Sequence, residues 1–151
     1  MKIMYADVTD PRVQAFLQAH LDDIAPTAPE ESRHALSFAE LAETSVRLWA
    51  VRDGDEVVGT GALAALEPGH EELKSMRTDQ ARRGQGIARE LLEYLVDNAK
   101  SRGITRISLE TGSMDFFAPA RALYASAGFA PCAPFGSYVE DPNSTFMTRV
   151  L

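Results

Sequence analysis

The sequence predicts a mixed sheet with flanking helices, an α/β or α+β fold, in one domain. Strand and helix signals alternate along the chain in the order βααβββαβαββ. The length of 151 residues suits one domain better than two. Hydrophobic residues make up 45% and charged residues 25% of the chain, as in ordinary globular proteins. We therefore expect residues 1–151 to form a single domain.

Composition also excludes several classes of function. The formal net charge of −7 argues against nucleic acid and anionic membranes as partners, because binding phosphates requires a surplus of Lys and Arg. Cys132 is the only cysteine, so an internal disulfide and a cysteine zinc site are both excluded. No apolar run is long enough to span a membrane, and acidic residues occupy the start of the chain where a signal peptide would be apolar. These features predict a cytoplasmic protein.

The N-terminal region predicts a strand followed by two helices. Residues 1–8 indicate a weak strand, and Asp10-Pro11 is typical of a helix start, since Asp caps free N–H groups and Pro fits the first turn. Apolar residues follow at helical spacing, at Val13, Phe16, Leu17, Leu21 and Ile24. Prolines within residues 26–29 end this helix, and residues 30–41 predict another.

The central region predicts three strands and the clearest helix. Residues 46–51 and 57–66 form a predicted hairpin around the turn dipeptide Asp53-Gly54. After Pro68-Gly69, residues 73–78 predict a further strand. Residues 87–100 predict a helix with apolar residues on one face, which Gly103 ends.

The C-terminal region completes the pattern. Residues 105–111 alternate strictly between polar and apolar, which predicts a strand with one buried face. A short helix is expected over residues 119–128, and two closing strands are expected from Phe129 onward and over residues 145–151.

The segment Arg82-Arg83-Gly84-Gln85-Gly86-Ile87-Ala88 predicts an anion site. Glycines allow a tight turn, and the free N–H groups at the start of the following helix attract anions. The spacing matches neither a P-loop nor a dinucleotide fingerprint. The alternative interpretation is a glycine-rich turn with solvated arginines.

Two motifs resemble the GNAT N-acetyltransferase family. Arg83-x-x-Gly86-x-Ala88 is similar to its acetyl-CoA pyrophosphate motif, Gln/Arg-x-x-Gly-x-Gly/Ala, and Tyr124 precedes Gly128-Phe129 as the family's tyrosine does. Length and element order also agree, so the resemblance covers essentially the whole chain. It implies a mostly antiparallel sheet of about seven strands flanked by about four helices, with a splayed fourth and fifth strand pair.

The resemblance implies acetyl-CoA as cosubstrate and no metal. It places the pyrophosphate on backbone amides of the glycine loop and the pantetheine arm along the fourth strand. The implied cofactor-binding residues are Met76, Arg77, Thr78, Arg83, Gly84, Gln85, Gly86, Ile87 and Ala88. A backbone N–H near Met76 would polarise the thioester carbonyl.

The resemblance also implies the acid and base of the reaction. Tyr124 would protonate the departing thiolate, and Glu72 is the candidate base that would deprotonate the attacking amine. Strand periodicity predicts one shared face for Glu72, Lys74, Met76 and Thr78. The alternatives are a core aromatic at position 124 and a solvated strand-end glutamate at position 72.

Candidate acceptor residues come from two segments. Phe117 occupies a position where many GNAT proteins have an asparagine, so Phe116 and Phe117 line an acceptor pocket or simply belong to the core. Tyr138 and Glu140 lie in the loop between the last two predicted strands. This loop either forms an acidic rim that suits a cationic amine or is simply exposed to solvent. His20, His34 and His70 lack metal-type spacing.

The resemblance therefore predicts an N-acetyltransferase that moves an acetyl group to the amine of a small or amino-acid-like molecule, by direct attack in a ternary complex. Two alternatives remain: acetylation of a protein N-terminus or lysine, and a non-catalytic acyl-CoA sensor. Because GNAT domains often dimerise, a homodimer is a further expectation.

Overall fold

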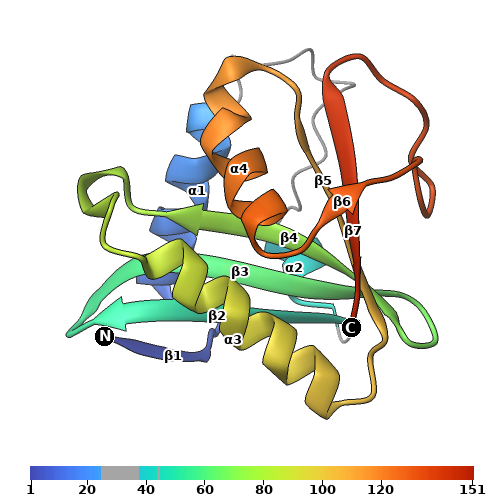
Figure 1. The fold of residues 1–151 in the computed structure, drawn as a ribbon. Helices are drawn as coiled ribbons and strands as arrows, with labels where there is room; N and C mark the ends of the chain where they lie inside the picture. The colour runs from blue at the N-terminus through green and yellow to red at the C-terminus, as the bar shows by residue number, and fades with distance from the viewer. Residues whose placement is uncertain (25–37, 44) are drawn as a thin grey trace.

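The structure, a computed structural model, describes residues 1–24, 38–43 and 45–151. In these residues, seven strands form one sheet with helices on both faces (Figure 1). The strands are β1 (Lys2–Tyr5), β2 (Val46–Asp53), β3 (Glu56–Glu67), β4 (His70–Thr78), β5 (Arg106–Gly112), β6 (Ala130–Pro131) and β7 (Ser144–Val150). The helices are α1 (Pro11–Ile24), α2 (Phe38–Leu41), α3 (Ile87–Ser101) and α4 (Ala118–Ser126), with short 3-10 turns at Gln80–Arg82 and Asp115–Phe117.

The sheet has the order β1-β2-β3-β4-β5-β7-β6. Every neighbouring pair is antiparallel except β4 and β5, which are parallel. This confirms the predicted mixed, mostly antiparallel sheet and the predicted hairpin of β2 and β3. β4 begins at His70 rather than Leu73, because its first residues pair with both β3 and β5.

The parallel pair is closed along only part of its length. Residues 70–73 of β4 pair with residues 106–109 of β5, whereas β4 continues to Thr78 and β5 to Gly112. We call residues 70–73 and 106–109 the paired end, and the parts of both strands beyond them the open end. The predicted splay of the fourth and fifth strands is thereby confirmed.

The two faces of the sheet bury different helices. α3 and α4 pack on one face, in a core that includes Trp49, Leu73, Leu91 and Leu95. α1 and α2 pack on the opposite face, where Val13 and Leu17 contact a smaller cluster (Figure 1). Asp10 caps α1 as predicted, because its carboxylate accepts a hydrogen bond of 2.9 Å from the N–H of Arg12.

Two predicted elements differ in extent. Only Phe38–Leu41 of the helix expected over residues 30–41 falls within the described residues, and there it is helical. The strand expected from Phe129 onward is limited to Ala130–Pro131, which pair with Thr148 and Met147 of β7. Among the described residues, no helix is both long and apolar enough to cross a membrane.

Candidate active site

A cavity of about 460 Å³ lies at the open end, between β4, the start of α3 and the start of α4. Its walls include most of the predicted cofactor residues, namely Met76, Arg77, Thr78, Arg83, Gly84, Gly86, Ile87 and Ala88. Phe116, Phe117 and Tyr124 line the same cavity. Gln85 is not among its wall residues. The chain therefore brings both sequence motifs, which are far apart along the chain, to one hollow.

The start of α3 presents unpaired donors to this cavity. Gly86 precedes the helix with φ +81° and ψ +9°, a left-handed conformation that glycine adopts without strain. The first hydrogen bond of the helix runs from the N–H of Glu90 to the carbonyl of Gly86, and no side chain caps the terminus. The N–H groups of Ile87 and Ala88 precede that bond, and the helix dipole adds partial positive charge there. The geometry suits a phosphate or pyrophosphate group.

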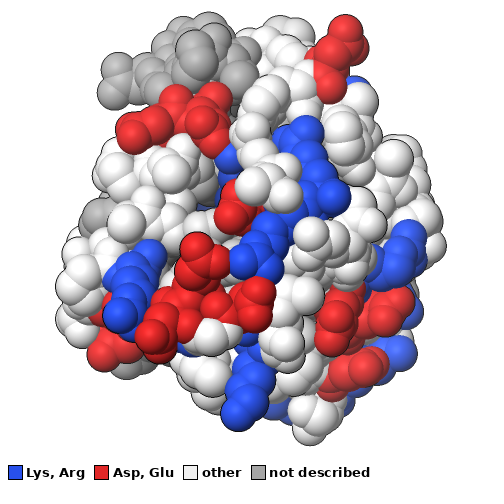
Figure 2. All heavy atoms as spheres, turned by 90° about the vertical axis from the view of Figure 1, so that its left-hand side faces the viewer, with Lys and Arg blue, Asp and Glu red and all other residues white. Residues whose placement is uncertain are grey.

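The arginines around the cavity are not equivalent. Arg77 binds Asp23 of α1, and Arg82 binds Asp53 and Glu56. Among the described residues, neither Arg83 nor Arg89 forms an ion pair with a carboxylate. Figure 2 shows this face of the molecule, where a central run of basic atoms is flanked by acidic groups. Two of the four guanidinium groups thus keep their charge available for an anion.

Tyr124 is the phenol of the cavity. It comes from α4, is 6% exposed, and packs edge-on against Phe129 with ring centroids 5.9 Å apart. No hydrogen bond to its hydroxyl occurs within the described part of the chain, so the O–H group remains available to a ligand in the cavity. Burial raises the pKa of Tyr124 above its ordinary value, and the phenol therefore stays protonated at neutral pH.

A bulge in β4 overturns the predicted shared face of Glu72 and Met76. Lys74 pairs with Ala62 and Arg77 with Thr60, so two residues of β4 oppose Gly61 alone, and Ser75 takes φ +53°. Met76 consequently packs into the α3 core, whereas Glu72 lies on the opposite face with Lys74. The extra residue shifts the strand period, which alternation in the sequence does not reveal.

On that opposite face, four side chains form what we call the Glu72 cluster: Glu72, Lys74, Glu110 and Tyr138. The Tyr138 hydroxyl donates a hydrogen bond of 2.5 Å to Glu72 Oε2, and Lys74 Nζ lies 2.9 Å from the same hydroxyl. Lys74 Nζ is also 3.4 Å from Glu72 Oε2. The late loop thus brings Tyr138 to Glu72, while Glu140 is exposed on the loop and outside this cluster.

Sequence reasoning missed Glu110 and His20. Glu110 sits at the start of the open end of β5, where burial raises its carboxyl pKa to about 7. Glu110 and Ser108 are two residues apart on an alternating strand, so the sequence could have placed them on the same face. His20 of α1 reaches the cavity, and its Nδ1 is buried without a hydrogen-bond partner among the described residues. Burial and the nearby Arg77 charge lower the His20 pKa to about 4, so the imidazole is neutral at pH 7.

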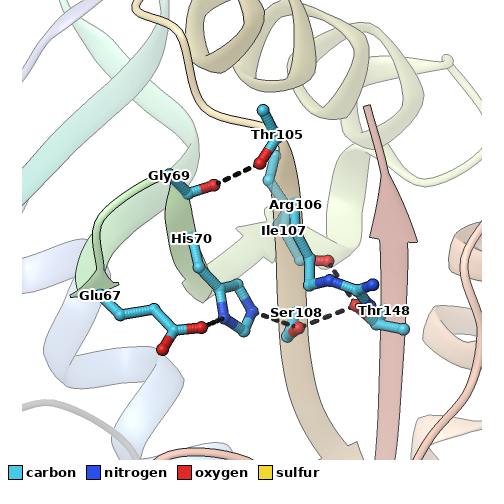
Figure 3. Close-up of polar contacts among 8 residues, drawn as sticks. All are labelled: Glu67, Gly69, His70, Thr105, Arg106, Ile107, Ser108 and Thr148. Carbon is cyan, nitrogen blue, oxygen red and sulfur yellow. Dashed lines mark hydrogen bonds and ion pairs between the residues drawn. The ribbon is translucent and has the colours of Figure 1, made fainter.

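The paired end holds a different polar network (Figure 3). His70 Nδ1 lies 3.2 Å from Glu67 Oε1, and its Nε2 lies 2.6 Å from Ser108 Oγ. Ser108 Oγ is in turn 2.9 Å from Thr148 Oγ1. Although the order carboxylate–imidazole–hydroxyl matches a nucleophilic triad, Ser108 is only 2% exposed. The network instead ties β4, β5 and β7 together.

No group of three or more His, Cys, Asp and Glu side chains in the described residues has a metal-binding arrangement. His34, one of the three histidines considered in the sequence, lies outside the described residues.

Comparison with known proteins agrees with this geometry. The acetyltransferase (GNAT) family model matches residues 13–129. This chain belongs to the GNAT acetyltransferase family. It is 44% identical over 151 residues to the uncharacterized N-acetyltransferase YsnE of Bacillus subtilis, covering 100% of both chains. It is 40% identical over 136 residues to the IAA acetyltransferase of Azospirillum brasilense, covering 89% of this chain and 86% of that protein.

Solved structures show the same fold. A Klebsiella pneumoniae protein, provisionally named an acyl-CoA N-acyltransferase, superposes with a TM-score of 0.80 at 32% identity, covering 99% of this chain and 97% of its own. This GNAT chain is therefore an N-acetyltransferase by family, with the family's sheet and splayed strand pair.

Proposed function

We propose that this protein transfers the acetyl group of acetyl-CoA to the amine of a small molecule, by direct attack within a ternary complex. One observation carries the proposal: a single cavity is lined by the N-terminus of α3, the 76–78 segment of β4 and Tyr124. Anion binding, thioester positioning and proton donation are thereby available in one hollow. Direct transfer needs these three capacities and no enzyme nucleophile.

On the cofactor side, the free N–H groups at residues 86–88 and the guanidinium of Arg83 would hold the pyrophosphate. The pantetheine arm would then extend along residues 76–78 of β4 toward Tyr124. Tyr124 would donate its proton to the thiolate as the carbon–sulfur bond breaks. Its raised pKa supports this role, because the phenol reaches neutral pH with its proton in place.

On the acceptor side, the attacking amine has to lose a proton, since an alkylammonium with a pKa of about 10 has no free lone pair. The sequence nominates Glu72 for this step. Glu72 lies in the paired end, one residue before its last pair, and this place supports a carboxylate near the amine. Glu72 and Glu110 together would also attract a cationic acceptor. The Azospirillum relative, named for IAA, favours a small-molecule acceptor over a protein.

Phe116 and Phe117 would supply an apolar wall for acetyl-CoA or the acceptor. Both line the cavity, and their rings contact each other edge-on with centroids 4.9 Å apart. Gly112 is adjacent: a Cβ there would meet Phe117 at 2.1 Å. We infer that this close approach fixes the Phe117 ring against the cavity.

Two measurements test the proposal. Isothermal titration with acetyl-CoA should show saturable binding, and no heat at millimolar ligand would contradict it. Thiol release should then be followed during a screen of small amines, peptides and lysine-containing proteins. Turnover with small amines supports the proposal, turnover with peptides alone would assign a protein acceptor, and binding without turnover on any acceptor would indicate a sensor.

A further inference from the structure

The face of the sheet that carries the Glu72 cluster holds two carboxylates in unlike surroundings. Glu72 pairs in register with Ser108 within the paired end. Glu110 is the first β5 residue beyond the last β4–β5 pair, Leu73 with Leu109. Because Ser108 and Glu110 are two residues apart on one strand, they share a face, which is the face of Glu72. Glu110 therefore stands where the two strands begin to separate.

Glu72 is held by a closed set of contacts. It accepts a hydrogen bond from Tyr138, its Oε2 lies 3.4 Å from Lys74 Nζ, and Lys74 also contacts the Tyr138 hydroxyl. Edge-on contacts of the Tyr138 ring with Phe135 at 5.2 Å fix the loop side of the arrangement. These contacts hold the Glu72 side chain in one place, which suits a residue that positions its neighbours.

Glu110 is compensated less completely, by the Ser144 side chain and by the more distant charge of Lys74. Within the described residues it forms no ion pair with lysine or arginine. Charged and titratable groups face it from two elements: Lys74 and Glu72 from β4, and Asp141 and Tyr138 from the loop before β7. Burial raises the pKa of Glu110 to about 7. A hydrogen bond with the Ser144 side chain and the charge of Lys74 oppose this effect, and the charges of Glu72 and Asp141 add to it. A carboxyl that exchanges its proton near neutral pH suits general base catalysis.

We infer that Glu110, at the point where β4 and β5 separate, is the general base for the acceptor amine, and that Glu72, Lys74 and Tyr138 position it. This inference rests on the proposed acetyl transfer. The carboxylate of Glu110 takes one proton from the acceptor ammonium, and the nitrogen lone pair then forms the C–N bond to the thioester carbon. As the C–S bond breaks, Tyr124 protonates the thiolate. The second nitrogen proton restores Tyr124, and Glu110 releases its proton to water.

Two matched variants, Glu110→Gln and Glu72→Gln, test this assignment. In the wild type, we expect kcat/KM for a small amine to rise with pH through a limb near pH 7. Carbon NMR of carboxyl-labelled glutamate should show one side chain titrating at the same pH. Glu110→Gln should remove both signals and lower kcat/KM about 100-fold or more. Glu72→Gln should keep both, with a lower midpoint because a neighbouring negative charge is gone.

Each failure has its own signature. If the wild type acetylates no acceptor, the proposed function fails. If the wild type is active and Glu110→Gln keeps both the limb and near-normal turnover, the base assignment is overturned. Loss of the limb in Glu72→Gln alone would assign the base to Glu72. Circular dichroism and acetyl-CoA affinity verify that each variant is folded.

Lys74→Met provides a second route should Glu110→Gln fold poorly. Removal of the cation should raise the NMR midpoint of the titrating glutamate and shift the kcat/KM limb to higher pH by the same amount. A limb that stays in place while the NMR midpoint moves would show that another group limits the reaction, and would overturn the assignment.

Discussion

The two ends of the β4–β5 pair use similar side chains in opposite ways. At the paired end, Glu71 is 3% exposed and binds Arg102 through two hydrogen bonds of 2.7 and 2.9 Å. His70 and Ser108 are likewise partnered there. Near the open end, His20 Nδ1 and the Arg83 guanidinium lack such partners among the described residues, and Glu110 forms no ion pair there. The open end therefore has polar groups that form no hydrogen bond or ion pair with the described residues and can contact a ligand.

This difference shows how stability and function divide along one pair of strands. Satisfied polar groups at the paired end contribute to the fold, because an unpaired buried group costs about 1–3 kcal/mol. Near the open end the buried Nδ1 of His20 carries that cost, whereas the exposed guanidinium of Arg83 is hydrated. Variants at the open end should accordingly change activity, and variants at the paired end should change stability.

The largest expected effect is on turnover in Tyr124→Phe. The variant keeps the ring that packs against Phe129 but loses the hydroxyl. We expect kcat to fall about 100-fold or more while the acetyl-CoA Kd and the thermal midpoint change little. Thiol release and isothermal titration measure these quantities. Unchanged kcat under conditions where chemistry limits the rate would remove the acid role from Tyr124.

Arg102→Met tests the paired end. It leaves the buried Glu71 carboxylate with only Arg47, whose Nη1 is 3.7 Å away. We expect a loss of about 3 kcal/mol in the free energy of unfolding, measured with urea, and unchanged kcat per folded molecule. Arg106→Met is the control: Arg106 is exposed, so the loss there should stay below about 1 kcal/mol. A lower kcat per folded molecule in Arg102→Met would contradict the claim that the paired end affects stability alone.

Gly86→Ala tests the anion site at the start of α3. An L-residue at φ +81° is strained by about 1–2 kcal/mol, which should distort the loop and raise the acetyl-CoA Kd about tenfold. Gly103→Ala carries matching strain at φ +83° beyond the far end of α3. It should lose similar stability and bind acetyl-CoA normally. Equal affinity losses in both variants would mean that Kd merely follows stability.

The smallest effect concerns the pH dependence of stability through His20. Its pKa is lowered from 6.5 to about 4, so the unfolded chain binds more protons between these values and stability falls as pH drops below 6.5. Between pH 8 and pH 6, His20 should account for about 1 kcal/mol of lost stability. His20→Gln should remove this loss in paired urea titrations. Proton NMR of the wild-type imidazole, if it titrated near 6.5, would contradict the prediction.

Much of the fold followed from local patterns. The apolar spacing of α3, the Asp10 cap of α1 and the Asp53-Gly54 turn are local signals, and each marked its element. The start of β4 and the shortness of β6 depended on what neighbouring strands offered for pairing. Strand ends are set by partners that lie far away in the sequence.

Only part of the candidate site could be predicted from the sequence. The Arg83–Ala88 motif and Tyr124 were predicted as site residues, and the structure places them around one cavity. Glycine at a helix start is a local signal with a direct physical reason. The prediction that Glu72 and Met76 share one face of the strand was wrong because of the bulge at Ser75. The alternation of polar and apolar residues does not show where a strand contains an extra residue. The homodimer, the cytoplasmic location and the identity of the acceptor stay predictions.

The family, the element order and the glycine turn before α3 could be predicted from the sequence, because each depends on residues close together in the chain. The surroundings of the polar groups at the site depend instead on the tertiary structure. His20, Glu110 and Tyr138 come from a helix, a strand and a loop that meet solely through folding. Their pKa values are set by burial and by neighbouring charges, which depend on the folded arrangement and not on the residue types alone.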